Sequence, residues 1–221
     1  MKASLDTDIL IHLYLSGKKG LIFSFFEELY LYAYLYEREL RNKSIKVYDS
    51  VTTDIENGHI KLITNKDLIE MDIKGLLERY KREYEYLFDM GELYAVSLAK
   101  AMGVMAFLSD DTKEDGPHDL LVRELIEDVI PFAFYELLFL RYLSSEITLD
   151  EMYQEFQEIN SKSIIQYPMN FRSRMLRTVR RFSGRHGTER DYNWICEFCD
   201  NGQIDYKVKM QGLKEYMNKF F

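Results

Sequence analysis

The sequence has few of the residues that mark secreted, fibrous or disordered proteins. Among 221 residues there are only two cysteines, Cys196 and Cys199, and three prolines. Two cysteines cannot build a disulfide framework. With 17 tyrosines and 14 phenylalanines, the composition is not that of a disordered chain. We therefore expect a folded chain with one sizeable core, or one domain with a smaller appendage.

Long apolar runs are also missing. The most apolar stretch, VIPFAFYELLFLRYL, contains Pro131, Glu136 and Arg141, whereas a membrane-spanning helix needs about 20 mainly apolar residues. The first residues, MKASLDTDILIHLYL, contain two aspartates before any long apolar run, and this is not the pattern of a secretory signal peptide. We expect a soluble, cytoplasmic protein with no membrane partner.

Positive charge is scarce and concentrated in one place. The chain has 29 Lys and Arg against 37 Asp and Glu, which gives a net charge of −8. Seven arginines nevertheless fall within residues 172–190, at positions Arg172, Arg174, Arg177, Arg180, Arg181, Arg185 and Arg190. Helical spacing places Arg174, Arg177 and Arg181 on one face. Since Arg binds phosphate through a planar fork, this stretch, including Arg185, is either an RNA-binding surface or a helix that docks by ion pairs onto the acidic first domain.

Short apolar stretches alternate with helical patterns in the first part of the chain. The predicted strands cover residues 3–5, 29–32, 60–63, 104–108 and 129–130, and the intervening helices include 66–88 and 91–102. This alternation favours a parallel sheet covered by helices on both faces. After about residue 145 only helical patterns follow, and the first begins with a capping box at Thr148 and Glu151. We predict an α/β domain over residues 1–145 and an all-helical extension over residues 146–221.

Acidic clusters follow two of the predicted strands directly: Asp-Thr-Asp at residues 6–8 and Ser-Asp-Asp at residues 109–111. Sites in parallel sheets lie at the carboxyl ends of strands, although a single Asp there often only caps a helix. Convergent carboxylates repel one another unless cations neutralise them. Oxygen ligands suit magnesium or manganese (Mg²⁺ or Mn²⁺), and such ions activate water for attack on a phosphodiester.

The opening LDTDILIHL resembles the first motif of the PIN domain family, an apolar strand followed by Asp-Thr-Asn/Ser and a helix. Asp6 and Thr7 then match the family's first acidic position and its neighbour, while Asp8 stands where Asn or Ser is usual. The run YLYERELRNK resembles the second motif, in which a Glu-Leu pair follows an apolar segment. Glu39 fits that position best, and Glu37 is its rival.

The run DMGELYAVSLAKAMGVMAFLSDD resembles the family's Gly-Glu-x-x-Ala-x-x-Leu-Ala helix, followed by a buried strand and a pair of aspartates. Glu92 then takes the third acidic position and Asp111 the fourth. Ser109 stands in the place of the common Thr or Ser, with Asp110 beside the fourth acid. The order of the three motifs matches the family over residues 1 to about 145.

The resemblance implies a Rossmann-like three-layer α/β/α fold with a parallel sheet of about five strands, and a nuclease that hydrolyses RNA with Mg²⁺ or Mn²⁺. The implied catalytic acids are Asp6, Glu39, Glu92 and Asp111. The implied metal ligands are Asp6, Glu92, Asp110 and Asp111, and Thr7 and Ser109 would hold a phosphate or ligand oxygen.

Partners and alternatives also follow from the resemblance. The family includes VapC-type toxins, so the resemblance implies a homodimer, an antitoxin or another protein as the partners to expect. Small toxins usually lack a helical extension, and a toxin–antitoxin role therefore does not transfer easily. Two alternatives stay open: a catalytically degenerate fold that only binds RNA or protein, and a structure-specific DNA nuclease.

Three other features have ordinary structural interpretations. Cys196 and Cys199 have the spacing of half a zinc site, with His186 as a third ligand, but a fourth is missing, so a buried pair is the simpler interpretation. His12 is expected to be a packing or surface residue. The run LYLYAYLYE indicates a packed strand–helix junction, with some tyrosines on a side that can face a partner.

Overall fold

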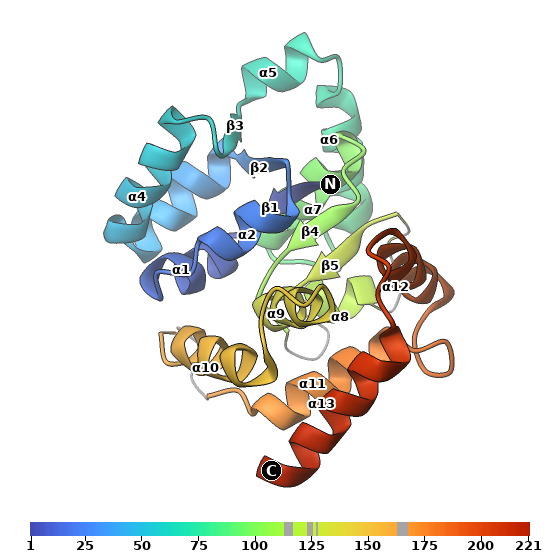
Figure 1. Cartoon of the computed structure of the whole chain (residues 1–221). Coiled ribbons are helices and arrows are strands. Elements are labelled where there is room, and N and C mark those ends of the chain that lie inside the picture. The colour runs from blue at the N-terminus through green and yellow to red at the C-terminus, as the bar shows by residue number, and fades with distance from the viewer. Residues whose placement is uncertain (113–116, 123–125, 127, 163–167) are drawn as a thin grey trace. The chain divides into compact units, whose positions relative to one another are not determined.

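A parallel sheet of five short strands forms the centre of the first part of the chain (Figure 1). The computed structural model describes residues 1–112, 117–122, 126, 128–162 and 168–221. The strands are β1 (Lys2–Leu5), β2 (Glu28–Tyr32), β3 (Lys61–Ile63), β4 (Ala106–Leu108) and β5 (Ile130–Phe132). Their order is β3-β2-β1-β4-β5, and every neighbouring pair is parallel. The prediction of an α/β fold with a five-stranded parallel sheet is confirmed.

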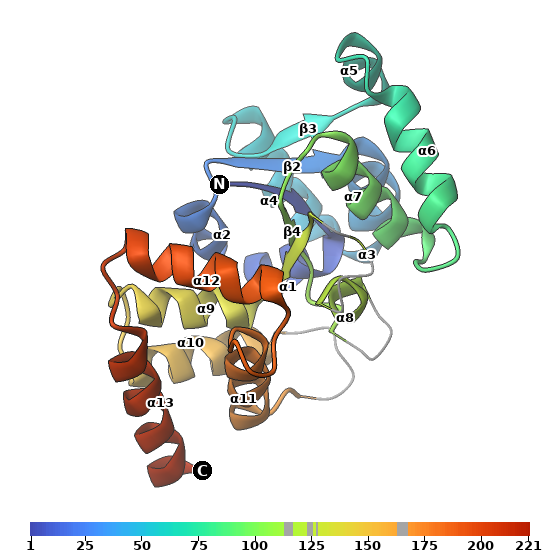
Figure 2. The same cartoon turned by 90° about the vertical axis from the view of Figure 1, so that its right-hand side faces the viewer.

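Helices lie on both sides of this sheet. Those of the first part are α1 (Thr7–Leu15), α2 (Gly20–Phe25), the π-helix η1 (Leu35–Leu40), α3 (Arg41–Lys43), α4 (Ile45–Glu56), α5 (Asn65–Glu70), α6 (Lys74–Tyr84), α7 (Met90–Ala101) and α8 (Pro117–Val122). Helix α7 packs against β1, β2 and β4. Helices α1 and α4 lie on the side of the sheet opposite α6 and α7 (Figures 1 and 2). This arrangement agrees with a three-layer fold.

The central strands are apolar because both faces of the sheet are covered. In β1, Ala3 and Leu5 are fully buried, and so are all three residues of β4. Ser4 is the polar exception in β1, and its hydroxyl donates a hydrogen bond of 3.0 Å to the carbonyl oxygen of Ala95 in α7. A buried hydroxyl keeps its hydrogen bond in this way, and the bond fastens α7 to the sheet.

Two local elements differ from the expectation. The predicted long helix over 66–88 is two helices, because α5 ends at Glu70 and Asp72 adopts a left-handed backbone with φ of 57° before α6 begins at Lys74. Residues 35–40 form a π-helix, η1, in place of an ordinary α-helical turn. Such turns are rare and frequently occur at functional sites.

The chain divides into two compact units, Met1–Phe134 and Tyr135–Phe221. In its described residues the second unit consists of α9 (Phe134–Leu143), α10 (Leu149–Asn160), α11 (Phe171–Arg181), α12 (Glu189–Asn201) and α13 (Tyr206–Phe220). The boundary expected at residue 145 lies one helix later than this division. The capping box that begins α10 is formed as predicted. None of the helices in the described residues is long and apolar enough to cross a membrane.

Candidate functional site

The carboxyl ends of β1 and β4 meet at Asp6 and Ser109. The two strands are neighbours, with Leu5 opposite Leu108, and the backbone N–H of Asp6 donates to the carbonyl of Leu108 at 2.9 Å. Asp6 caps α1, since its Oδ1 accepts from the N–H of Thr7 at 2.6 Å. Its Oδ2 accepts from the Ser109 hydroxyl at 2.8 Å. The two acidic clusters therefore open onto the same edge of the sheet.

Glu39 reaches this edge from η1. Its Oε2 accepts a hydrogen bond of 3.1 Å from the Thr7 hydroxyl. Lys43, one α-helical turn further along, lies 3.4 Å from the same oxygen, 3.0 Å from Asp8 Oδ1 and 3.1 Å from the Thr7 hydroxyl. Glu39 rather than Glu37 thus accompanies Asp6. Sequence reasoning missed Lys43, although its i,i+4 spacing from Glu39 is the usual signal of a helical ion pair.

The first turn of α7 faces the Glu39 carboxylate closely. A Cβ atom at Gly91 would stand 1.9 Å from Glu39 Oε1, so any side chain at this position would displace the Glu39 carboxylate. The next residue, Glu92, is 7% exposed. Its carboxylate accepts from the N–H of Asp89 at 3.1 Å, and its own N–H donates to Asp89 Oδ1 at 3.1 Å. Glu92 therefore closes a capping box at the edge where Glu39 arrives.

Asp110 and Asp111 take different directions after β4. Asp110 is buried, and its Oδ2 lies 2.7 Å from Nδ1 of the buried His12, while its Oδ1 accepts from the N–H of Phe134 at 2.8 Å. Because both carboxylate oxygens accept hydrogen bonds inside the protein, Asp110 joins α1 to the end of β5, and its role as a metal ligand stays a prediction. Asp111 is half-buried, and its N–H donates to the Ser109 hydroxyl at 3.2 Å.

The electrostatics of this acidic edge favour a cation. Burial and the charge of Asp8 raise the pKa of Asp6 from 3.8 to about 7, against the opposing effects of the Ser109 and Thr7 hydrogen bonds and of Lys43. Burial alone would lower the pKa of Lys43, but the charges of Asp8, Glu39 and Asp6 raise it. Burial is the largest cause of the shift at Asp6, whereas at Lys43 the negative charges of the neighbouring carboxylates outweigh burial.

The oxygen atoms of these side chains are suitable ligands for a hard divalent cation, but in this structure they do not converge on one point. Carboxylate and hydroxyl oxygens from Asp6, Glu39 and Thr7 are the donors that Mg²⁺ and Mn²⁺ prefer. Among the residues that the structure describes, however, no three His, Cys, Asp or Glu side chains are grouped as metal ligands. Lys43 stands within the acidic edge instead, and Glu92 is engaged in its helix cap.

The arginine-rich stretch contains both exposed and buried members. Arg181 is 5% exposed and lies between Glu136 at 2.8 Å and Asp191 at 2.6 Å, all within the second unit. It supports the packing of this unit, and its buried guanidinium presents little surface to RNA. Arg174 lies 5.5 Å from the centre of the Tyr135 ring and is half-buried, as Arg177 is; Arg185 is exposed. These three stay as the expected RNA-contacting set.

The cysteine pair carries the features of packed thiols. Cys199 is buried, and burial together with Cys196 and Asp200 raises its pKa to about 11. A zinc-binding thiolate needs the opposite shift. His186 and the two cysteines do not belong to a metal-ligand group in the described part of the chain. The expected burial holds for Cys199, whereas Cys196 is half-buried.

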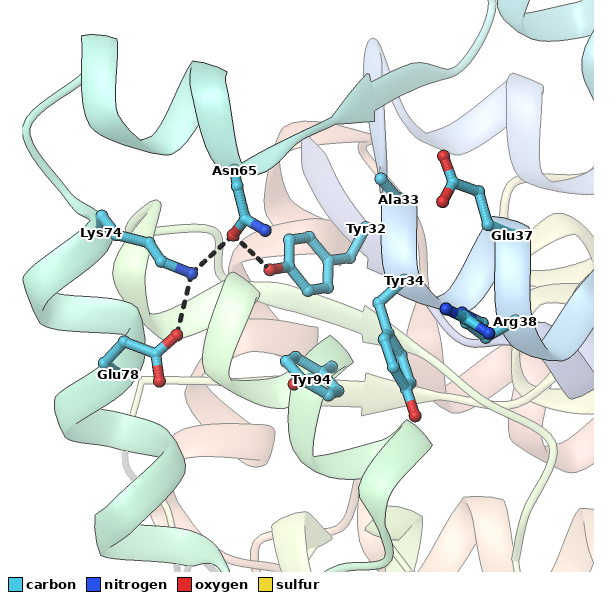
Figure 3. Close-up of a pocket in the computed structure, with 9 residues that line it drawn as sticks. All are labelled: Tyr32, Ala33, Tyr34, Glu37, Arg38, Asn65, Lys74, Glu78 and Tyr94. Atoms are coloured by element: carbon cyan, nitrogen blue, oxygen red, sulfur yellow. Dashed lines mark hydrogen bonds and ion pairs between the residues drawn. The ribbon is translucent and has the colours of Figure 1, made fainter.

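A pocket of about 450 Å³ opens beside the acidic edge, at the carboxyl end of β2 (Figure 3). The side chains that define it are Tyr32, Tyr34, Arg38, Asn65, Lys74 and Tyr94. We name it the tyrosine pocket. It was not predicted as a site, although the tyrosine-rich run at residues 30–36 was its visible signal.

Comparisons with protein-family models, with curated proteins and with solved structures gave no match to this chain. The resemblance to the PIN family therefore rests on the three motifs.

Proposed function

We propose that this chain is a nuclease that hydrolyses phosphodiester bonds of RNA with Mg²⁺ or Mn²⁺ at the acidic edge around Asp6. The observation that carries the proposal is the raised pKa of Asp6, about 7, at the meeting point of β1 and β4. A carboxylate that is costly to ionise when alone becomes a good ligand when a divalent cation neutralises it. The choice of RNA follows from the motif resemblance.

The residues of the acidic edge have separate tasks in this proposal. Asp6, Glu39, Glu92 and Asp111 would hold the cation, which supplies Lewis-acid chemistry and lowers the pKa of bound water. Ser109 fixes Asp6 Oδ2 by its hydrogen bond, and Thr7 fixes Glu39 in the same manner.

Lys43 and Glu92 supply the adjustable part of the site. The Lys43 side chain is 41% exposed, so its ammonium group can turn from Asp8 and Glu39 toward a phosphate oxygen. Glu92 would release its hydrogen bond from the N–H of Asp89, and that N–H would donate to a water molecule instead. Both movements involve side chains alone and leave the sheet unchanged.

One observation favours a second candidate function. Lys43 already places an ammonium group among Asp8, Glu39 and Thr7, where a catalytic cation would otherwise neutralise the acids. A fold that binds nucleic acid without cutting it would keep such a lysine permanently in this position.

The decisive experiment measures cleavage of end-labelled single-stranded RNA, and of DNA of the same sequence, in Mg²⁺, Mn²⁺ or EDTA. We expect RNA cleavage that EDTA abolishes and that both Asp6→Asn and Asp111→Asn remove while circular dichroism stays unchanged. The exposed Asp49 on α4 provides a matched control, because Asp49→Asn makes the same chemical change away from the acidic edge.

Each alternative predicts its own result. Cleavage by Asp6→Asn and Asp111→Asn at the wild-type rate would refute the assignment of these two acids. Binding of RNA without cleavage in any metal would select the binding module, and cleavage of structured DNA alone would select a DNA nuclease.

A further inference from the structure

The tyrosine pocket offers flat aromatic surfaces held in fixed positions. The ring of Tyr94 lies 4.4 Å from that of Tyr34 and 5.2 Å from that of Tyr32, centre to centre. Lys81 holds Tyr94 from outside the pocket, with its ammonium group 4.1 Å from the ring centre and 3.1 Å from the hydroxyl. Tyr34 is 36% exposed, so part of its ring is available to a ligand.

The pocket also presents an oriented hydrogen-bond donor. Asn65 Oδ1 accepts from the Tyr32 hydroxyl at 2.9 Å and from Lys74 Nζ at 2.5 Å. Since an ammonium group can only donate, the oxygen of the amide must face Lys74, and its nitrogen must face the other way. Figure 3 shows that nitrogen pointing toward the middle of the pocket. Lys74 is held in turn by Glu78 at 2.8 Å.

Charged side chains stand at the rim on the side of η1. Arg38 and Glu37 are both exposed and line the pocket, and in Figure 3 Arg38 lies on the side of Tyr34 away from Tyr94. An aromatic face, an inward amide donor and a rim guanidinium correspond to the three parts of a nucleotide: a flat base, its acceptor atoms and its phosphate.

The position of the pocket connects it to the acidic edge. Tyr32 ends β2, Asp6 follows β1, and these strands are paired neighbours, about 4.8 Å apart as in any sheet. The helix η1 serves both places, because Glu37 and Arg38 line the pocket whereas Glu39 contacts Thr7. A nucleic acid strand that lies along this edge of the sheet would reach both.

We propose that the tyrosine pocket binds one unstacked base of a single-stranded RNA, stacked on Tyr34 and hydrogen-bonded by Asn65, with Arg38 on the adjacent phosphate. The proposal deepens the proposed function and rests on it for the choice of nucleic acid. It predicts that the chain selects single strands over duplexes, because a paired base cannot enter a pocket.

The test measures binding rather than cleavage. Fluorescence anisotropy of a labelled single-stranded RNA of about ten nucleotides is recorded in EDTA, where a nuclease of the proposed type is inactive. We expect Tyr34→Leu to weaken binding about 10-fold or more, which is the range of one base–aromatic stack. Asn65→Ala should weaken it by less. Tyr86→Leu is the matched control, since Tyr86 is 79% exposed in the same unit.

An abasic scan of the same RNA separates the pocket from general electrostatic binding. One abasic position should weaken wild-type binding about as much as Tyr34→Leu does, and the combination should weaken it no further, because both changes remove the same contact. Binding by Tyr34→Leu equal to that of Tyr86→Leu, or no binding of single strands by the wild type, would overturn the pocket.

The two proposals can fail separately. Base-dependent binding of RNA without cleavage supports the base-binding pocket and refutes the proposed nuclease activity. Metal-dependent cleavage, together with normal RNA binding by the pocket variants, supports the nuclease activity and refutes the base-binding pocket.

Discussion

Gly91 is the position at which stability and activity should separate most clearly. The substitution Gly91→Ala puts a Cβ atom 1.9 Å from Oε1 and 2.6 Å from Cδ of Glu39. The obstructing atoms are the end of a flexible side chain, so the backbone of α7 can stay in place and Glu39 must swing away. Its hydrogen bond from Thr7, 3.1 Å long, is then lost.

The stability effects of Gly91→Ala nearly cancel. Alanine in place of glycine within a helix stabilises by about 0.5–1 kcal/mol, and loss of one hydrogen bond costs about 0.5–1.5 kcal/mol. We expect the free energy of unfolding in urea to change by less than about 1 kcal/mol. If Glu39 is a metal ligand, its displacement should lower metal-dependent cleavage by about 10- to 100-fold, as perturbed metal sites commonly show.

Gly20→Ala provides the control, because a Cβ atom there meets nothing within 4 Å. That variant should keep full activity. Full cleavage by Gly91→Ala would refute the role of Glu39, and a loss of several kcal/mol would refute the view that only a flexible side chain has to move.

Three further predictions concern Asp6 and the arginines. Because the folded pKa of Asp6, about 7, lies above its unfolded value of 3.8, its ionisation destabilises the fold as pH rises from about 4 to 7. Asp6→Asn should therefore raise the free energy of unfolding above pH 7, by up to ~4 kcal/mol, measured in urea with EDTA. Arg181→Met should destabilise the helical unit by ~3–5 kcal/mol in the same assay, because it removes the buried guanidinium that lies between the carboxylates of Glu136 and Asp191. Replacing Arg174, Arg177 and Arg185 by Gln should reduce the salt dependence of RNA binding, with a slope in log–log units lower by ~0.7 per lost phosphate contact.

Each of these predictions has a matched control. The Asp6→Asn profile is compared with that of Asp49→Asn, and a parallel pH dependence in the two variants would refute the assignment to Asp6. Exposed Arg180→Met should change stability by less than about 0.5 kcal/mol; equal losses at both arginines would contradict the ion-pair argument. For RNA binding, the exposed lysines of α13, Lys207, Lys214 and Lys219, lose the same charge when changed to Gln. An equal change of slope in that triple variant would show a general charge effect.

The central strands and the acidic edge were predictable because their signals are local. β1 and β4 are short apolar runs, each followed at once by acidic residues, and the adjacency of parallel strand ends then brings Asp6 and Ser109 together. The capping box at Thr148 and Glu151 was also predictable from its local Thr-x-x-Glu spacing. Asp89 and Glu92 have a related Asp-x-x-Glu spacing and form a capping box as well.

The remaining features depend on contacts that no local pattern reveals. Arg181 belongs to an arginine-rich run typical of a solvated or RNA-binding face, but its burial depends on Glu136, a residue distant along the chain. The break at Asp72 has no glycine or proline to mark it. The tyrosine pocket needs β2, α5, α6 and α7 together, and a one-dimensional pattern does not show which tyrosines these helices leave uncovered.

Lys43 and a divalent cation compete for the same charges, and this competition decides between the two candidate functions. Three carboxylates, Asp6, Asp8 and Glu39, act on the lysine. One ammonium group cannot balance three negative charges, and burial together with the charge of Asp8 raises the pKa of Asp6 to about 7. At neutral pH the acidic edge is therefore balanced partly by a proton on Asp6. A divalent cation at this edge would take the place of that proton, and for this reason we prefer the proposed nuclease to the binding module.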